Sequence, residues 1–156
     1  MHHLYDCMIK EKLLNQNDIK GPVVDLKLLG FFSPKHEMDL PQYCYQIMLG
    51  RKPIGKISLR LGINEDVAIT GHVGYEIENS YQGHNYAFYA LLMMKTLAKA
   101  HGYRYILLTC EVDNEQSIHT ILKAGGRLLE RDIYVPANHI YYVLGKKKMN
   151  RYEIKL

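Results

Sequence analysis

The chain has 156 residues, of which 47% are hydrophobic and 23% are charged, as is typical of a soluble globular protein. This length predicts a single domain over residues 1–156, with residues 1–20 as a peripheral arm. No apolar run approaches the roughly 20 residues of a membrane helix, and the N-terminus lacks the basic start and apolar core of a secretory signal. Three scattered cysteines without a CxxC pair argue against a disulfide framework. We therefore expect a cytoplasmic protein with reduced thiols and no membrane partner.

The net charge of +4 resides at the C-terminal end. Residues 145–156 hold five basic residues and one acidic residue, so the rest of the chain carries 15 of each sign. A short basic segment is more often a solvated edge than a nucleic-acid site. We therefore expect no nucleic-acid partner and no role for Lys146, Lys147 and Lys148 in ligand binding.

The first half of the chain alternates between strand patterns and turns. A short helix over residues 5–14 is one interpretation of the N-terminal segment. Runs rich in β-formers predict strands over 23–29, 43–49 and 56–61, and Gly50 to Pro53 has a hairpin signature. The two prolines in residues 30–41 predict a loop that lies over a substrate cleft.

The segment from Gly71 to Ala100 changes period, from a strand to a long helix. His72, Val73, Tyr75 and Ile77 follow the strand pattern, whereas apolar residues from Ala87 onward recur at i, i+3, i+4 and i+7. Residues 82–86 form the junction between the two elements. Backbone amides at the start of a helix have no intrahelical acceptor and favour an anion. The junction therefore predicts a phosphate-binding turn.

The second half predicts another buried strand and helix, followed by closing strands. Residues 105–110 are almost continuously apolar, as in a strand buried on both faces. A right-handed crossover would place this strand parallel to the one that begins at Gly71. Asp113 and Gln116 predict a capping box at the start of a helix that ends at Lys123. Residues 127–135, 139–144 and 152–156 read as strands, with a turn at 136–138.

Two motifs in this order resemble the GNAT superfamily of acyl-CoA-dependent N-acyltransferases. Residues 82–87 (QGHNYA) are similar to its Gln/Arg-x-x-Gly-x-Gly/Ala pyrophosphate turn, with Asn85 in place of the first glycine, and Asn tolerates unusual backbone angles. Asn114 and Ser117, with Gly125 further on, resemble the Asn-x-x-Ser/Ala element of the family. The resemblance covers about residues 43–134 and is closest to a poorly characterised bacterial branch.

The resemblance implies a GNAT-like α/β (α+β) fold: a mixed, mostly antiparallel central sheet, helices on both faces, and two parallel strands that splay apart around the pantetheine arm. It implies acetyl-CoA as co-substrate and transfer of its acetyl group, by direct attack in a ternary complex, to a primary amine on a small molecule or peptide. A homodimer is compatible with this layout. The residues that it assigns to the cofactor are Tyr75, Glu76, Ile77, Gln82, Gly83, His84, Asn85, Tyr86, Ala87, Asn114 and Ser117.

Two side chains that many relatives use in catalysis are absent. Ile121 stands where many members carry a tyrosine acid, and Thr109 stands where some carry a glutamate base. Glu76 is the candidate base, and Glu111 is a second carboxylate near the splay. The two absences also leave a catalytically silent acyl-CoA-binding regulatory module as the alternative, and a nucleic-acid binder as a more distant one.

Other chemistries fit the sequence less well. Cys110, His119 and Glu111 have the residue types of a nucleophile, a base and an orienting acid, but a cysteine inside an apolar strand is usually an inert core thiol. The eight histidines show no ligand spacing, so no metal is expected.

Overall fold

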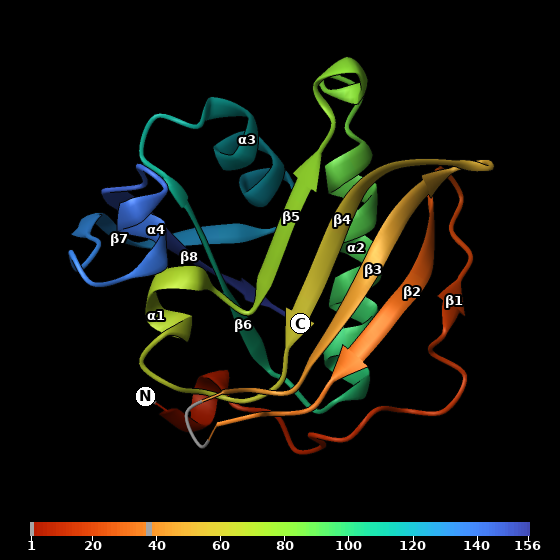
Figure 1. The fold of residues 1–156 in the computed structure, drawn as a ribbon, viewed down its shortest axis with the longest axis horizontal. Coiled ribbons are helices and arrows are strands. Elements are labelled where there is room, and N and C mark those ends of the chain that lie inside the picture. The colour runs from red at the N-terminus through yellow and green to blue at the C-terminus, as the bar shows by residue number, and fades with distance from the viewer. Residues whose placement is uncertain (1, 37–38) are drawn as a thin grey trace.

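The computed structural model describes residues 2–36 and 39–156 as two antiparallel sheets that stand side by side (Figure 1). One sheet has the strand order β1-β2-β3-β4-β5, and the other has the order β6-β8-β7. The strands are β1 (Asp18–Ile19), β2 (Asp25–Phe32), β3 (Gln42–Leu49), β4 (Lys52–Arg60), β5 (Val73–Ile77), β6 (Tyr105–Glu111), β7 (Gly126–Tyr134) and β8 (Lys148–Lys155). The helices are α1 (Val67–Thr70), α2 (Tyr86–Ala100), α3 (Glu115–Lys123) and α4 (Ile140–Val143), with 3₁₀ turns η1 (His2–Tyr5) and η2 (Asn79–Tyr81). The predicted α/β class with a mostly antiparallel sheet is confirmed.

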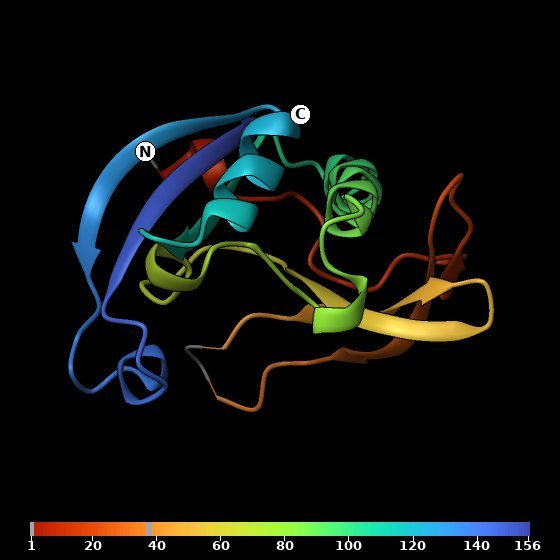
Figure 2. The ribbon, with the colours of Figure 1, turned by 90° about the horizontal axis from the view of Figure 1, so that it is seen from above.

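Alternation along the strands directs one face of the five-stranded sheet toward the core. Tyr43, Tyr45 and Ile47 of β3 are fully buried, as are Ile57 and Leu59 of β4. Helix α2 covers this face with its own apolar stripe, whereas none of the described helices packs across the opposite face (Figure 2). The hairpin that joins β3 to β4 has Gly50 at φ 62°, as its turn signature predicts.

The three-stranded sheet carries helices on both of its faces. Leu107 of β6 packs with Val67 of α1, whereas Ile106 and Leu108 belong to the same core cluster as Ile121 of α3. Because successive side chains of a strand point to opposite faces, α1 and α3 lie on opposite sides of β6. The prediction of a strand buried on both faces is confirmed.

Strand β8 is the middle strand of its sheet, so the expectation that the C-terminal segment is a solvated edge is wrong. Tyr152 and Ile154 are buried between the basic residues. The Glu153 carboxylate accepts a hydrogen bond of 2.6 Å from the hydroxyl of Tyr5 and a salt bridge from Arg127. Burial would raise the pKa of Glu153, but these two donors outweigh burial and lower it.

Strands β5 and β6 touch where β5 begins and then diverge (Figure 1). The amide of His72 donates to the carbonyl of Leu107 at 2.7 Å, and the amide of Leu107 donates to Nδ1 of His72 at 2.9 Å. Gly71 has φ 74°, and a Cβ there would lie 2.9 Å from the Leu107 carbonyl oxygen, so the close approach requires glycine. The predicted parallel neighbours therefore meet only at this point, which creates a gap between their ends.

The side chain of His72 fixes this junction as a neutral imidazole. The residue is fully buried, and burial lowers its pKa to about 4. Because Nδ1 accepts the Leu107 amide, Nε2 carries the proton and donates to the carbonyl of Gly62 at 2.9 Å.

Several predicted elements are corrected. Residues 139–144 are not a strand: the ring of His139 accepts the amide of Tyr141 and starts the helical turn α4. The helix expected over residues 5–14 is absent: Tyr5 ends the 3₁₀ turn η1, residues 6–14 are not helical, and Tyr5 and Cys7 are buried. The capping box fails because Asn114, not Asp113, is the N-cap of α3. The short elements β1 and α1 were not predicted.

The chain between β2 and β3 has no helix or strand in its described part, as expected for a loop, and residues 37–38 of that loop lie outside the described residues. None of the helices that the structure describes is long and apolar enough to span a bilayer.

Candidate active site

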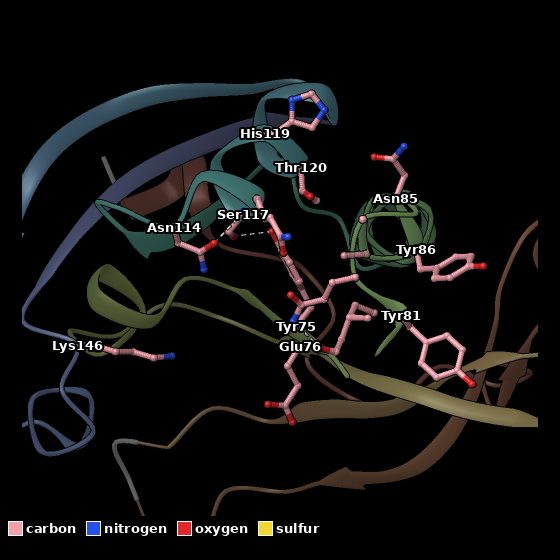
Figure 3. A pocket seen from close by; sticks show the side chains of 15 residues that line it. Tyr75, Glu76, Tyr81, Asn85, Tyr86, Asn114, Ser117, His119, Thr120 and Lys146 are labelled. Atoms are coloured by element: carbon pink, nitrogen blue, oxygen red, sulfur yellow. Dashed lines mark hydrogen bonds between the residues drawn. The ribbon is translucent and has the colours of Figure 1, made fainter. Parts of the chain in front are cut away.

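A pocket of about 520 Å³ occupies the gap between the diverging strands (Figure 3). Strand β5, the turn before α2, the start of α2 and the first turns of α3 form its walls. Its lining residues are Tyr75, Glu76, Ile77, Tyr81, Gln82, Gly83, Asn85, Tyr86, Ala87, Asn114, Gln116, Ser117, His119, Thr120 and Lys146. Ten of the eleven cofactor residues that the sequence suggested therefore share one cavity.

The start of α2 has neither a side-chain cap nor an acidic residue in its first turn. Asn85 is the N-cap in the left-handed region, with φ 62° and ψ 20°, and its side chain makes no capping hydrogen bond. No acidic residue lies in the first turn of the helix. The first amides of a helix lack intrahelical acceptors and carry its positive dipole end. Asn85 thus performs the conformational task of the glycine that it replaces, and the amides remain available to a phosphate.

Two other residues of the turn have different positions. The amide of the Gln82 side chain donates to the carbonyl of Ile77 at 3.0 Å and to Oδ1 of Asn79 at 3.1 Å, so it fastens the turn to the end of β5. His84 lies outside the pocket lining, and its ring sits 5.4 Å from that of Tyr86.

Strand β5 offers a free edge to the pocket, because it pairs with β4 along its other edge. The amide of Glu78 donates to the carbonyl of Ile54 in β4 at 2.9 Å. Backbone groups of a strand alternate between its two edges, so the amides of Tyr75 and Ile77 point toward the pocket. They can pair with an extended amide-containing ligand or polarise a carbonyl oxygen.

A hydrogen-bonded pair of hydroxyls bridges the two sides of the gap. The hydroxyl of Tyr75 lies 2.8 Å from Oγ of Ser117, and the Ser117 amide donates to Oδ1 of Asn114 at 3.1 Å. Burial raises the pKa of Tyr75 to about 12, so its hydroxyl stays protonated at neutral pH. Figure 3 shows this chain of contacts between β5 and α3.

Glu76 lies between two cavities. Its side chain points away from that of Tyr75, as alternation along β5 requires (Figure 3). It lines the first pocket and also a second one of about 320 Å³, together with Gln46, Lys56 and Glu78. The candidate base therefore has access to the uncovered face of the sheet.

The alternative nucleophile is not assembled. Cys110 is buried, and burial raises the pKa of its thiol to about 11, which keeps it protonated. His119 lies on an exposed position of α3, and Ile121 is fully buried in the core. Among the residues that the structure describes, no group of three or more His, Cys, Asp and Glu could hold a metal ion.

Sequence reasoning missed five lining residues: Tyr81, Gln116, His119, Thr120 and Lys146. Thr120 follows Ser117 by three positions, so helical periodicity could have indicated it. Lys146 was expected to have no role in ligand binding, but the structure places it in the pocket lining. It reaches the pocket from a segment about 60 residues beyond the α2 turn, and no sequence motif marks it.

The sequence matches a family model described as an acetyltransferase (GNAT) domain over residues 28–127. The matched region contains β3 to β6, both long helices and nearly all of the pocket lining. No curated protein sequence matches the chain.

Solved structures of acetyltransferases share the fold. A putative ribosomal-protein-serine acetyltransferase from Vibrio cholerae has a TM-score of 0.65 at 12% identity, covering 92% of this chain and 100% of that one. The microcin C7 self-immunity acetyltransferase MccE, in complex with acetyl-CoA and AMP, has a TM-score of 0.56 at 19% identity, covering 74% and 61%. RimL, a ribosomal L7/L12 alpha-N-protein acetyltransferase in complex with coenzyme A, has a TM-score of 0.56 at 19% identity, covering 74% of this chain and 62% of that one. The alignments span less than two thirds of the latter two proteins.

Proposed function

Because the chain belongs to the acetyltransferase (GNAT) family, we propose that it transfers an acetyl group from acetyl-CoA to a primary amine by direct attack in a ternary complex. The observation that carries this proposal is that one cavity contains both the start of α2, which has no acidic residue in its first turn, and the free edge of β5. A pyrophosphate followed by an amide-containing arm has the chemistry that these two features bind.

The residues divide into binding and reacting groups. We assign the pyrophosphate to the amides of residues 83–88 and the pantetheine amides to the edge of β5 at Tyr75 and Ile77. Acetyl-CoA supplies an activated thioester. In this proposal the Ile77 amide polarises the acyl carbonyl, and Glu76 accepts the proton of an amine that arrives from the uncovered face.

The paired hydroxyls of Tyr75 and Ser117 can serve as the proton donor that Ile121, in the place of the tyrosine acid of many relatives, cannot provide. One hydroxyl can donate its proton to the departing sulfur, and the other hydroxyl can then pass its own proton to the first along the hydrogen bond that joins them. This assignment explains how a chain without the tyrosine acid of many relatives retains a proton donor in the same gap.

Two measurements test the function. Acetyl-CoA at about 100 times its dissociation constant should stabilise the fold by about 2.7 kcal/mol, with much smaller thermal shifts from NAD and ATP at equal concentration. A panel of small amines and peptides with free N-termini should then release free thiol from acetyl-CoA. Equal shifts with all three nucleotides would indicate a generic nucleotide site, and tight binding without turnover on any amine would leave the silent module as the better description.

A further inference from the structure

The surface around α4 combines exposed apolar side chains with uncompensated positive charge. Residues 133–152 contain no Asp or Glu but include Lys146, Lys147, Lys148 and Arg151, of which Arg151 forms a salt bridge with Glu130. Val143 and Ile140 are 73% and 60% exposed, and Tyr134 is 72% exposed. We define the α4 surface as Tyr134, Ile140, Tyr142, Val143, Lys147 and Lys148.

Two contacts within the α4 surface pair a lysine with a tyrosine ring. Nζ of Lys147 lies 5.1 Å from the ring centroid of Tyr142, and Nζ of Lys148 lies 5.2 Å from that of Tyr134. Neither lysine has an ion pair within the described part of the chain. The ammonium groups therefore lie over exposed tyrosine rings, with their charge free for a partner.

The α4 surface adjoins the candidate active site. Lys146 is next to it in sequence and lines the acyl-CoA pocket, where its side chain reaches in from the α4 side (Figure 3). Nε2 of His139, at the start of α4, lies 2.5 Å from the Asp66 carboxylate and fastens the segment to the body. In Figure 2, α4 lies on the side of the molecule away from α2, the side on which Glu76 is accessible.

We propose that the α4 surface docks an acidic polypeptide whose free amine is the acetyl acceptor. The proposal rests on the acetyltransfer proposed above and names the class of its acceptor. Carboxylates would pair with Lys147 and Lys148, and apolar side chains would cover Ile140 and Val143. The surface fits a polypeptide better than a nucleic acid, because Ile140 and Val143 offer no ring on which bases stack. The rings of Tyr134 and Tyr142 already have the ammonium groups of Lys148 and Lys147 over them. Helix α4 has only four residues, too few for an amphipathic membrane anchor.

The first experiment measures docking without turnover. The probe is a labelled peptide with a blocked N-terminus and four glutamates among apolar residues. The control peptide has the same sequence with four glutamines in place of the glutamates. Fluorescence anisotropy should show about tenfold tighter binding of the glutamate peptide at low salt and little difference at high salt, since salt screens exposed charges. Equal binding of the two peptides would overturn the proposal, as would tighter binding of an RNA oligonucleotide or of anionic phospholipid vesicles.

The second experiment uses the same peptides with free N-termini as substrates. The double change Lys147→Glu and Lys148→Glu should raise KM for the glutamate peptide about tenfold, without changing kcat or the acetyl-CoA dissociation constant. The matched control, Lys27→Glu with Lys99→Glu, makes the same charge change at two exposed positions on β2 and α2 and should leave KM within about twofold. Equal rises of KM in both pairs would mean that net charge alone acts.

The two experiments separate the two proposals. If the blocked acidic peptide binds the α4 surface but no free peptide or amine is acetylated, docking stands and the acetyltransfer fails. If small amines are acetylated but Lys147→Glu with Lys148→Glu changes neither binding nor KM of acidic peptides, the acetyltransfer stands and docking fails. The apolar variant Ile140→Ser with Val143→Ser should weaken both peptides, because it removes the contact that they share.

Discussion

Ala87 tests the phosphate cradle at the scale of a single side chain. Its Cβ lies at the first turn of α2, in the pocket wall formed by the free amides. Ala87→Glu places bulk and a carboxylate where the pyrophosphate is proposed to lie, so acetyl-CoA binding should weaken roughly 100-fold or more by calorimetry. Ala100→Glu adds the same group at the exposed far end of the helix and should bind normally. Unchanged affinity of Ala87→Glu would refute the proposed cofactor site.

Glu76 tests the proposed base. Glu76→Gln keeps the shape and the backbone edge of β5, so acetyl-CoA affinity should persist while kcat falls roughly 100-fold. The loss should be greatest at low pH, where the amine is protonated. Glu78→Gln, which lines only the second pocket, serves as the matched control and should retain kcat. Full turnover in Glu76→Gln would place the base elsewhere or assign its task to water.

At the scale of elements, the junction of β5 and β6 should make the fold sensitive to acid. His72 has a pKa of about 4 in the folded state against about 6.5 in the unfolded chain. The unfolded state therefore binds the proton first, and stability should fall as the pH drops from about 6.5 to 4, by about 3 kcal/mol from this group. Urea unfolding between pH 7 and pH 4 measures the loss.

A variant isolates the part that His72 plays. His72→Phe removes the titration, leaves the Leu107 amide unpaired and leaves the Gly62 carbonyl with only the 3.5 Å contact from the Tyr103 hydroxyl. It should therefore cost about 2–5 kcal/mol at pH 7 but show a shallower acid slope. Burial also lowers the pKa of His101, so part of the slope should remain. The exposed His84→Phe should keep the parent profile, and an equal slope in His72→Phe would assign the acid sensitivity to other groups.

The turn before α2 depends on a left-handed residue. Asn85→Gly should leave stability within about 1 kcal/mol and retain acetyl-CoA binding, because glycine adopts φ 62° without strain. Asn85→Val should cost about 1–2 kcal/mol and weaken binding, because a β-branched residue resists this conformation. Thermal unfolding measures the stability of the two variants, and calorimetry measures their affinity for acetyl-CoA. Equal stability and equal affinity of the two variants would show that the left-handed φ of residue 85 does not matter.

Element patterns in the sequence predicted most of the fold, and local competition explains the misses. Strand β6 and helix α2 were predictable because their apolar periods extend over many residues. Residues 139–144 have strand composition, but the His139 side chain caps a helical turn there. The Asn85 turn was identified by its motif, whereas Lys146 enters the pocket through tertiary folding that no local pattern encodes.

At the scale of the whole molecule, the last twelve residues should be indispensable. They contain β8, which pairs with both β6 and β7, and Glu153, which holds Tyr5 and Arg127. Deletion of residues 145–156 should therefore abolish cooperative thermal unfolding, as followed by circular dichroism. Full-length chain with Lys147→Gln and Lys148→Gln should unfold like the parent, and cooperative unfolding of the truncated chain would show that the three-stranded sheet is dispensable.

The position of Glu76 between two cavities on opposite faces of β5 has a kinetic consequence. If the amine and the thioester enter through separate cavities, neither blocks the entry of the other. They should therefore bind in random order. Initial rates measured while the concentrations of acetyl-CoA and of the amine are varied should give intersecting double-reciprocal lines. A dead-end analogue of one reactant should be a competitive inhibitor only toward the reactant that it resembles. Parallel lines would instead mean that the acetyl group rests on the protein between two half-reactions, for which the buried thiol of Cys110 offers no accessible carrier.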